Sequence, residues 1–132
     1  MTLDDLSLFA PTAPERITLP SARLEAAALP WQPHPAFPGV HMKHLVLGAD
    51  TGGALSCHLV RVAPGAALGE HDHPGQTEVH KVLGGAGLCR CAGADIAYAP
   101  GDLAVIPPGR RHSVAAGEPG LLLLAQFCPA LK

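Results

Sequence analysis

The sequence has few charged residues and no cluster of basic ones. Only 15% of its 132 residues are Asp, Glu, Lys or Arg, and the formal net charge is -2. Nucleic acids and anionic membrane surfaces are bound through clustered Lys and Arg side chains. We therefore expect neither a nucleic acid nor a membrane surface as a partner.

Long hydrophobic runs and an export signal are also missing. The longest apolar run, residues 121–125, is far shorter than the roughly 20 residues that a membrane-spanning helix needs. The first ten residues contain two aspartates and neither Lys nor Arg, the wrong charge for a secretory signal. These features predict a cytoplasmic protein without a membrane span.

The spacing of a metal or redox motif is missing from the cysteines. The four cysteines, which form no C-x-x-C pair, are Cys57, Cys89, Cys91 and Cys128. Cys89 and Cys91 are too close in one expected strand to form a comfortable disulfide. Without an export signal we expect all of them to be free thiols, with packing as their role.

Glycine and proline, by contrast, are abundant. Fifteen Gly and fourteen Pro divide the chain into short apolar runs, a pattern typical of an all-β sandwich or barrel. The expected strands are residues 40–47, 54–62, 78–83, 88–91, 96–99, 103–106, 112–115 and 121–128. That number of strands is enough to close one small barrel with a single core.

The pattern differs before Pro30. Prolines interrupt the first twenty residues, and only residues 21–29, SARLEAAAL, look weakly helical, with Ser21 as a possible N-cap. We expect an irregular N-terminal arm over residues 1–35 and a barrel domain over residues 36–132. The arm is expected either to lie along the barrel wall or to reach a second subunit.

Histidine is concentrated in the middle of the chain. Four of the eight histidines fall between His58 and His80. His71 and His73 are two residues apart, and residues with that spacing on a strand point to the same face. The Pro-Gly turn that follows allows Glu78 to open the next strand near both imidazoles.

A fourth ligand is predicted from a separate strand. Residues 107–109, Pro-Pro-Gly, form a stiff turn that would bring His112 to the same point. Three neutral imidazoles and a carboxylate suit one divalent transition metal, with iron favoured and manganese, nickel, zinc or copper as alternatives. An octahedral ion would keep two positions open for water, dioxygen or a chelating substrate, whereas tetrahedral zinc would be closed and structural.

These residues resemble the two motifs of the cupin superfamily. The first motif, G-x5-H-x-H-x3,4-E-x6-G, is matched in full by Gly65, His71, His73, Glu78 and Gly85. The second, G-x5-P-x-G-x2-H-x3-N, is matched by Gly101, Pro107, Gly109 and His112, with Ala116 in place of the final Asn. That Asn is not a metal ligand in the family, so its replacement leaves the ligand set intact.

The resemblance implies a small single-domain cupin: a jelly-roll β-barrel with a metal inside it, frequently a homodimer. It does not imply one reaction, because the superfamily includes dioxygenases, isomerases, epimerases, lyases, cyclases, sugar-binding regulators and storage proteins. The function must be inferred from the pocket.

Two further histidines are candidate catalytic residues. His80 lies two residues after Glu78 and points into the same barrel unless a β-bulge intervenes, where it would be a base, a substrate contact or a hydrogen-bond partner of a ligand. His58 shares parity with Val60 and Val62, while Arg61 on the opposite face favours water, so His58 is also expected inside.

Other residues leave alternatives open. Arg110 and Arg111 precede His112 and either reach a substrate carboxylate or remain on the surface. In the last strand, one of two alternating sets lines the interior: Gln126 with Cys128, or Ala125 with Phe127.

The sequence therefore favours a metal-dependent enzyme. A dioxygenase-like reaction, or else an isomerase or lyase reaction, would act on a small polar molecule bound at the ion, with His80 or His58 moving a proton. The alternative is a non-catalytic sensor or regulatory module that binds a metal and a ligand. A storage role ranks last because it leaves the complete ligand set without a purpose.

Overall fold

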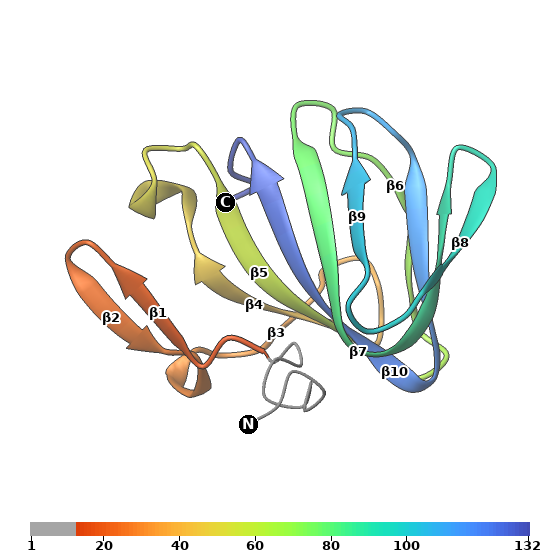
Figure 1. The fold of residues 1–132 in the computed structure, drawn as a ribbon, viewed down its shortest axis with the longest axis horizontal. Helices are drawn as coiled ribbons and strands as arrows, with labels where there is room; N and C mark the ends of the chain where they lie inside the picture. Colours follow the sequence, from red (N-terminus) through yellow and green to blue (C-terminus); the bar gives the residue numbers. More distant parts are fainter. Residues whose placement is uncertain (1–12) are drawn as a thin grey trace, which may run out of the picture.

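The computed structural model describes residues 13–132, which are mostly β-strand (Figure 1). A separate hairpin pairs β1 (Arg16–Leu19) with β2 (Ala22–Glu25). The main sheet contains β3 (Gln32–Pro33), β4 (Val40–Val46), β5 (Ser56–Val62), β6 (Ala67–His71), β7 (Thr77–Cys91), β8 (Ala94–Tyr98), β9 (Leu103–Ile106) and β10 (His112–Cys128). The described residues contain no α-helix, and the predicted all-β class is confirmed.

The helical segments of the described chain are two short 3-10 turns. They are η2 (Ala26–Ala28) and η3 (Gly48–Asp50), each three residues long. No helix between residues 13 and 132 has the length and apolar character needed to cross a membrane.

The long strands β7 and β10 each take part in two layers. The C-terminal half of β10, from Leu121, pairs with β5 and with the first half of β7, which pairs with β9. The N-terminal half of β10 pairs with β6 and with the second half of β7, which pairs with β8. The sheet therefore folds over on itself, and the main hydrophobic core lies between the two layers (Figure 1).

Glycines allow the two long strands to bend together. Gly85 has a φ of 82° and Gly120 a φ of 80°, values that L side chains rarely adopt. A Cβ on Gly85 would also clash with the carbonyl oxygen of Gly120. The register between β7 and β10 shifts between Ala116 and Leu121, where both strands bend. The glycines at these bends interrupt the apolar pattern, so each long strand looks like two strands in the sequence. The expected strands 78–83 and 88–91 are the two halves of β7, and 112–115 and 121–128 belong to β10.

The prediction of weak helix over residues 21–29 is wrong. This segment forms β2 and the turn η2, and Leu24 pairs with Ile17 across the hairpin. Ile17 and Ala26 are buried in a second hydrophobic cluster with Leu45 and Leu59 of the barrel. Burial of this apolar surface outweighs a helix propensity of a few tenths of a kcal/mol per residue, roughly, because tertiary packing dominates so short a segment.

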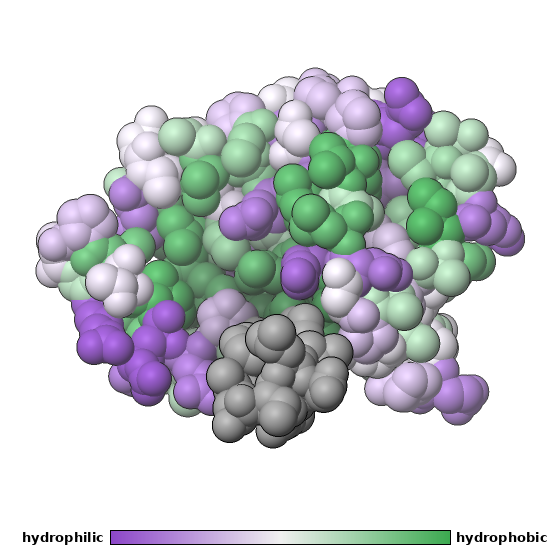
Figure 2. Space-filling view, viewed as in Figure 1, coloured by the Kyte–Doolittle hydropathy of each residue, from purple (hydrophilic) through white to green (hydrophobic). Residues whose placement is uncertain are grey.

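Part of the predicted arm therefore lies along the barrel wall. The hairpin covers the outer surface of β4 and β5, and β3 joins the barrel sheet by pairing with β4. Figure 2 shows apolar side chains gathered along the junction between hairpin and barrel. Residues 1–12, on which the export-signal interpretation rests, lie outside the described residues.

We expect Gly85→Ala to destabilise the fold by at least about 2 kcal/mol, because it forces a left-handed φ on Ala and a clash with the Gly120 backbone. Gly84→Ala is the matched control, since a Cβ there meets no atom within 4 Å. Urea unfolding of both variants measures the difference, and equal midpoints would contradict this account of the bend.

Candidate metal centre

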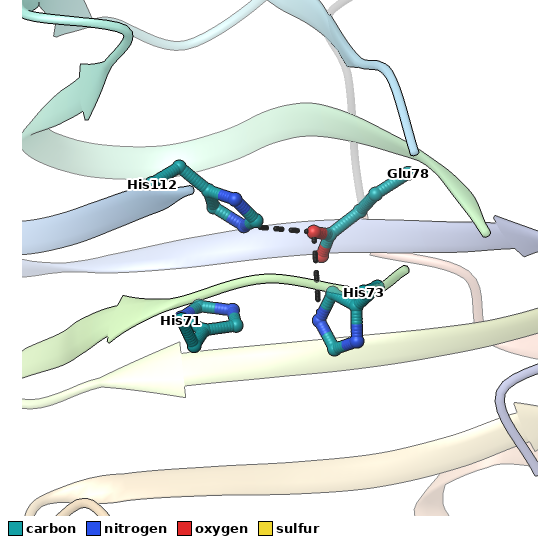
Figure 3. A group of neighbouring side chains, drawn as sticks. All are labelled: His71, His73, Glu78 and His112. Atoms are coloured by element: carbon teal, nitrogen blue, oxygen red, sulfur yellow. Dashed lines mark ion pairs between the residues drawn. The ribbon is translucent and has the colours of Figure 1, made fainter. Parts of the chain in front are cut away.

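The four predicted ligands converge from three segments of the barrel (Figure 3). His71 is the last residue of β6, His73 follows in the turn, Glu78 lies near the start of β7, and His112 is the first residue of β10. His71 and His112 are directly opposite each other in the β6–β10 ladder. One ligand atom from each of the four residues lies within 4.8 Å of all the others.

Backbone hydrogen bonds orient two of the imidazoles. His71 Nδ1 lies 2.7 Å from the carbonyl oxygen of Gly69, and His112 Nδ1 lies 2.9 Å from that of Arg110. Because a carbonyl oxygen only accepts, both Nδ1 atoms carry the hydrogen, and a neutral ring then leaves Nε2 as a bare lone pair. Burial lowers the pKa of His71 and of His73, which favours the neutral rings that a metal requires.

Glu78 places a negative charge in the interior. Its side chain is buried, and Oε1 lies 3.0 Å from His112 Nε2 and 3.9 Å from His73 Nε2. Burial raises the pKa of this carboxyl, but the neighbouring His112 and His80 rings lower it further, so that the pKa lies below its ordinary value. Glu78 is therefore a carboxylate that needs a nearby positive charge.

Two atoms of this cluster lack a hydrogen bond within the described residues: Glu78 Oε1 and His112 Nε2. Burial lowers the pKa of His112, but its contact with Glu78 raises that pKa above the ordinary value, so a positive charge belongs between these two buried atoms, as a proton on Nε2 or as a metal ion. Ligand atoms bound to one ion at about 2.1 Å are at most roughly 4.2 Å apart, close to the upper limit of 4.8 Å among these four residues. The donor set and the orphaned atoms both fit a divalent metal ion.

His80 is buried and faces the same interior as Glu78. The β7–β9 pairing runs without a shift from Glu78 to His80, so no bulge separates the two. His80 Nε2 lies 2.8 Å from Glu78 Oε2, and its Nδ1 lies 2.9 Å from the Tyr98 hydroxyl. Since the carboxylate only accepts, His80 donates its Nε2–H, and its bare Nδ1 accepts the hydrogen of Tyr98.

This Tyr98–His80–Glu78 chain fixes the direction of the ligand carboxylate. With Oε2 held by His80, Oε1 is left to face the ion position. Burial raises the pKa of Tyr98, so its hydroxyl remains a donor. Tyr98, the single Tyr of the chain, is not predicted by any motif, because its place at the end of the short strand β8 gives no sign of this contact.

His58 is also buried but belongs to a different network. Its Nδ1 lies 2.7 Å from His44 Nδ1, and its Nε2 lies 2.8 Å from Ser56 Oγ. The Phe127 ring contacts both His58 and the ligand His73, with centroid distances of 5.7 and 4.9 Å. Phe127 therefore lies between His58 and the ligand His73. The described hydrogen bonds of His58 do not connect it to the ligand cluster, so they do not support its predicted catalytic role.

A small cavity of about 60 Å³ borders the ligand cluster. Its walls include three of the ligands, His71, His73 and Glu78. Its apolar walls include Met42, Val60, Leu68, Leu123, Phe127 and Leu131. A larger open cleft of about 710 Å³ lies elsewhere, beside Trp31 and Arg61, but the ligand cluster does not border it.

The cavity resolves the alternatives left open in the last strand. Ala125 and Phe127 line it, so Gln126 and Cys128 face outward. Neither Arg110 nor Arg111 is among the residues that line the cavity. Arg111 instead forms an exposed ion pair with Glu70 at 3.2 Å. The four cysteines are free thiols in the structure, as expected.

Comparison with protein families identifies this fold. The family described as Cupin domain matches residues 58–125, a segment that contains all four ligands and both candidate catalytic histidines. The chain belongs to the cupin family, and the resemblance of the two motifs is confirmed. A search of the curated proteins found no match to the sequence.

Solved structures show the same barrel. KdgF from Halomonas sp. is 27% identical, with a TM-score of 0.67 over 76% of this chain and 87% of that one. A predicted oxalate decarboxylase from Thermotoga maritima is 24% identical, with a TM-score of 0.69 over 80% and 97%. An RmlC-like cupin from Shewanella frigidimarina is 18% identical, with a TM-score of 0.73 over 90% and 97%. The predicted cupin jelly roll is thus confirmed.

We expect Tyr98→Phe to weaken metal binding by roughly tenfold, because partners of a ligand are typically worth 10- to 100-fold in affinity. Removing the hydroxyl leaves His80 Nδ1 without its donor and frees the ring that holds Glu78. Competitive titration of Co²⁺ against a chelator measures the change. Unaltered affinity in a folded variant would show that Tyr98 only fills space.

We expect His58 to make the metal-free protein less stable in acid. Burial, together with His44 and Lys132, lowers the pKa of His58 to about 4. Between pH 6.5 and 4 the unfolded chain binds a proton at this site that the folded chain does not, so stability falls as the pH falls. Between pH 7 and pH 5 the wild type should lose about 2 kcal/mol more than His58→Gln.

Urea unfolding at a series of pH values, with a chelator present, measures this difference. The His58→Gln variant should be less stable than the wild type at pH 7, because it loses contacts to His44 and Ser56, yet its stability should depend less on pH. Parallel curves for the two proteins would contradict the assignment.

Proposed function

We propose that this cupin is a metal-dependent enzyme that acts on a small molecule bound at the ion. Iron is the favoured metal, with manganese, nickel, zinc and copper as the alternatives. A dioxygenase-like reaction is the first choice, and isomerisation or a lyase reaction is the second. The observation that carries the proposal is that the ligand cluster borders a cavity instead of being closed off by protein.

A purely structural zinc ion would be surrounded by its four protein ligands. Here His71, His73 and Glu78 also form part of a cavity wall, so a small molecule in the cavity would reach the ion. When bound, the metal would supply Lewis acidity or activate dioxygen. The apolar walls would exclude water from the reaction, and Glu78 would be held in place by His80.

His80 is the nearest candidate for moving a proton. Its Nε2 contacts the ligand Glu78 and its Nδ1 contacts Tyr98, so His80 would have to release one of these partners to exchange a proton with a bound molecule. In the resting arrangement both ring nitrogens are occupied, which favours a positioning role for His80.

Glu78→Gln should lower metal affinity by at least about 100-fold, because it removes the charged ligand and leaves the divalent ion with no anionic ligand from the protein. Glu70→Gln is the matched control: Glu70 lies within the same sequence motif, next to His71, but its carboxylate is exposed and pairs with Arg111. Metal analysis and titration should give about one ion per chain for the wild type and for Glu70→Gln.

The coordination number separates an enzyme from a closed site. X-ray absorption of the iron- or manganese-loaded protein should show five or six ligands, with exchangeable water among them. A four-coordinate ion held by protein atoms alone would overturn the enzyme proposal while leaving the metal site intact.

A further inference from the structure

The lining of the cavity beside the metal centre restricts what the site can hold. Most of its walls are apolar, and the polar side chains in the described part of the chain that line it are all His or Glu. They are the ligands His71, His73 and Glu78, together with His80 and His34. No Lys, Arg, Ser, Thr, Asn or Gln of the described residues lines this cavity.

Most of these polar groups have no capacity left for a second polar group on the ligand. The ligand side chains face the ion position, and both ring nitrogens of His80 are occupied by Glu78 and Tyr98. A further hydroxyl, amide or carboxylate on a bound molecule would therefore be buried without a partner, which is unfavourable.

The net charge of the ion with its ligands also disfavours a second polar group on the bound molecule. A divalent ion with one carboxylate and three neutral imidazoles has a net charge of about +1, which one anionic group bound to the ion would balance. The nearby basic side chain of Arg111 is exposed and is paired with Glu70. A second negative charge on the ligand would therefore enter an apolar space with no counter-charge.

His34 is the exception among the polar residues. It lies between β3 and β4, in the segment that the sequence assigned to the N-terminal arm, and its ring stacks on Phe37 at 4.7 Å. Its Nδ1 accepts a hydrogen bond from the backbone N–H of Ala36 at 3.0 Å, so its hydrogen is on Nε2. Within the described residues, Nε2 has no hydrogen-bond partner.

We propose that the site takes a small molecule with one metal-binding end and an apolar, uncharged remainder that carries at most one hydrogen-bond acceptor, which His34 Nε2–H meets. This inference rests on the proposed function and narrows its substrate class. The small cavity, about 60 Å³, limits the buried part of the molecule to a short group.

The test uses full-length protein loaded with Co²⁺, whose visible spectrum reports ligand exchange at the ion. Propionohydroxamate and malonomonohydroxamate share the same metal-binding end, and the second carries a carboxylate where the first has a methyl group. We expect the uncharged compound to bind at least about tenfold more tightly. Equal affinity, or tighter binding of the charged compound, would overturn the proposal.

A cation introduced into the cavity should remove the preference for the uncharged compound. Leu131 is half-buried and lines the cavity, so Leu131→Arg adds a cation without emptying the core. We expect this variant to bind malonomonohydroxamate at least as tightly as propionohydroxamate. A folded, Co²⁺-loaded Leu131→Arg protein with the wild-type preference would show that the tail lies outside this cavity and would contradict the proposal.

His34 is tested with butyrohydroxamate and methoxyacetohydroxamate, in which an ether oxygen replaces one methylene group. His34→Leu should weaken binding of the ether about fivefold and leave the alkyl compound unchanged, and His34→Gln, which keeps a donor, should restore part of the loss. The control is His41→Leu, since His41 lines the outer cleft. An equal loss for both compounds would assign His34 a packing role and remove it from the proposal.

Co²⁺ binding and probe preference distinguish failure of the proposed function from failure of the proposed ligand class. If the protein binds no stoichiometric Co²⁺, the proposed function is wrong and the ligand class falls with it. If Co²⁺ binds and shows exchangeable positions but the charged probe is preferred, only the ligand class is overturned.

Discussion

The structure is organised around one buried negative charge. The Glu78 carboxylate lies inside an apolar barrel, with one oxygen held by His80 and the other facing Nε2 of His112. A buried carboxylate is tolerated only when it is paired with a positive charge. A cation between Glu78 and His112 supplies that charge, and the Nε2 atom of a neutral His71 ring is a further ligand for a metal ion there.

The fold brings these groups together from strands that are distant in the sequence. The long strands β7 and β10 bend at Gly85 and Gly120 and take part in both layers, so the first residue of β10 faces the start of β7 across the interior. The same bend leaves a small apolar cavity beside the ligands. The ligand cluster and the cavity beside it thus arise from one backbone arrangement, in a chain whose family hosts many different reactions.

The cupin fold is compatible with many reactions, but the lining of the cavity restricts which molecules can bind beside the ligand cluster. Most of the lining residues are apolar, the polar ones are His or Glu, and His34 comes from outside the segment that carries the cupin motifs. The predicted small polar substrate is thereby refined in the proposal to a molecule that is polar at one end only. Arg110 and Arg111, which the sequence offered as partners for a carboxylate, do not line the cavity.

The sequence by itself determined the strand pattern and the four ligands, because alternation on a strand and turn residues are local properties that spacing records. Tertiary structure alone decided that two pairs of expected strands are single bent strands, that residues 21–29 form hairpin and turn instead of helix, and that Tyr98 and His34 reach the site. These outcomes depend on burial and on contacts between residues far apart in the chain, for which a single sequence carries no periodic signal.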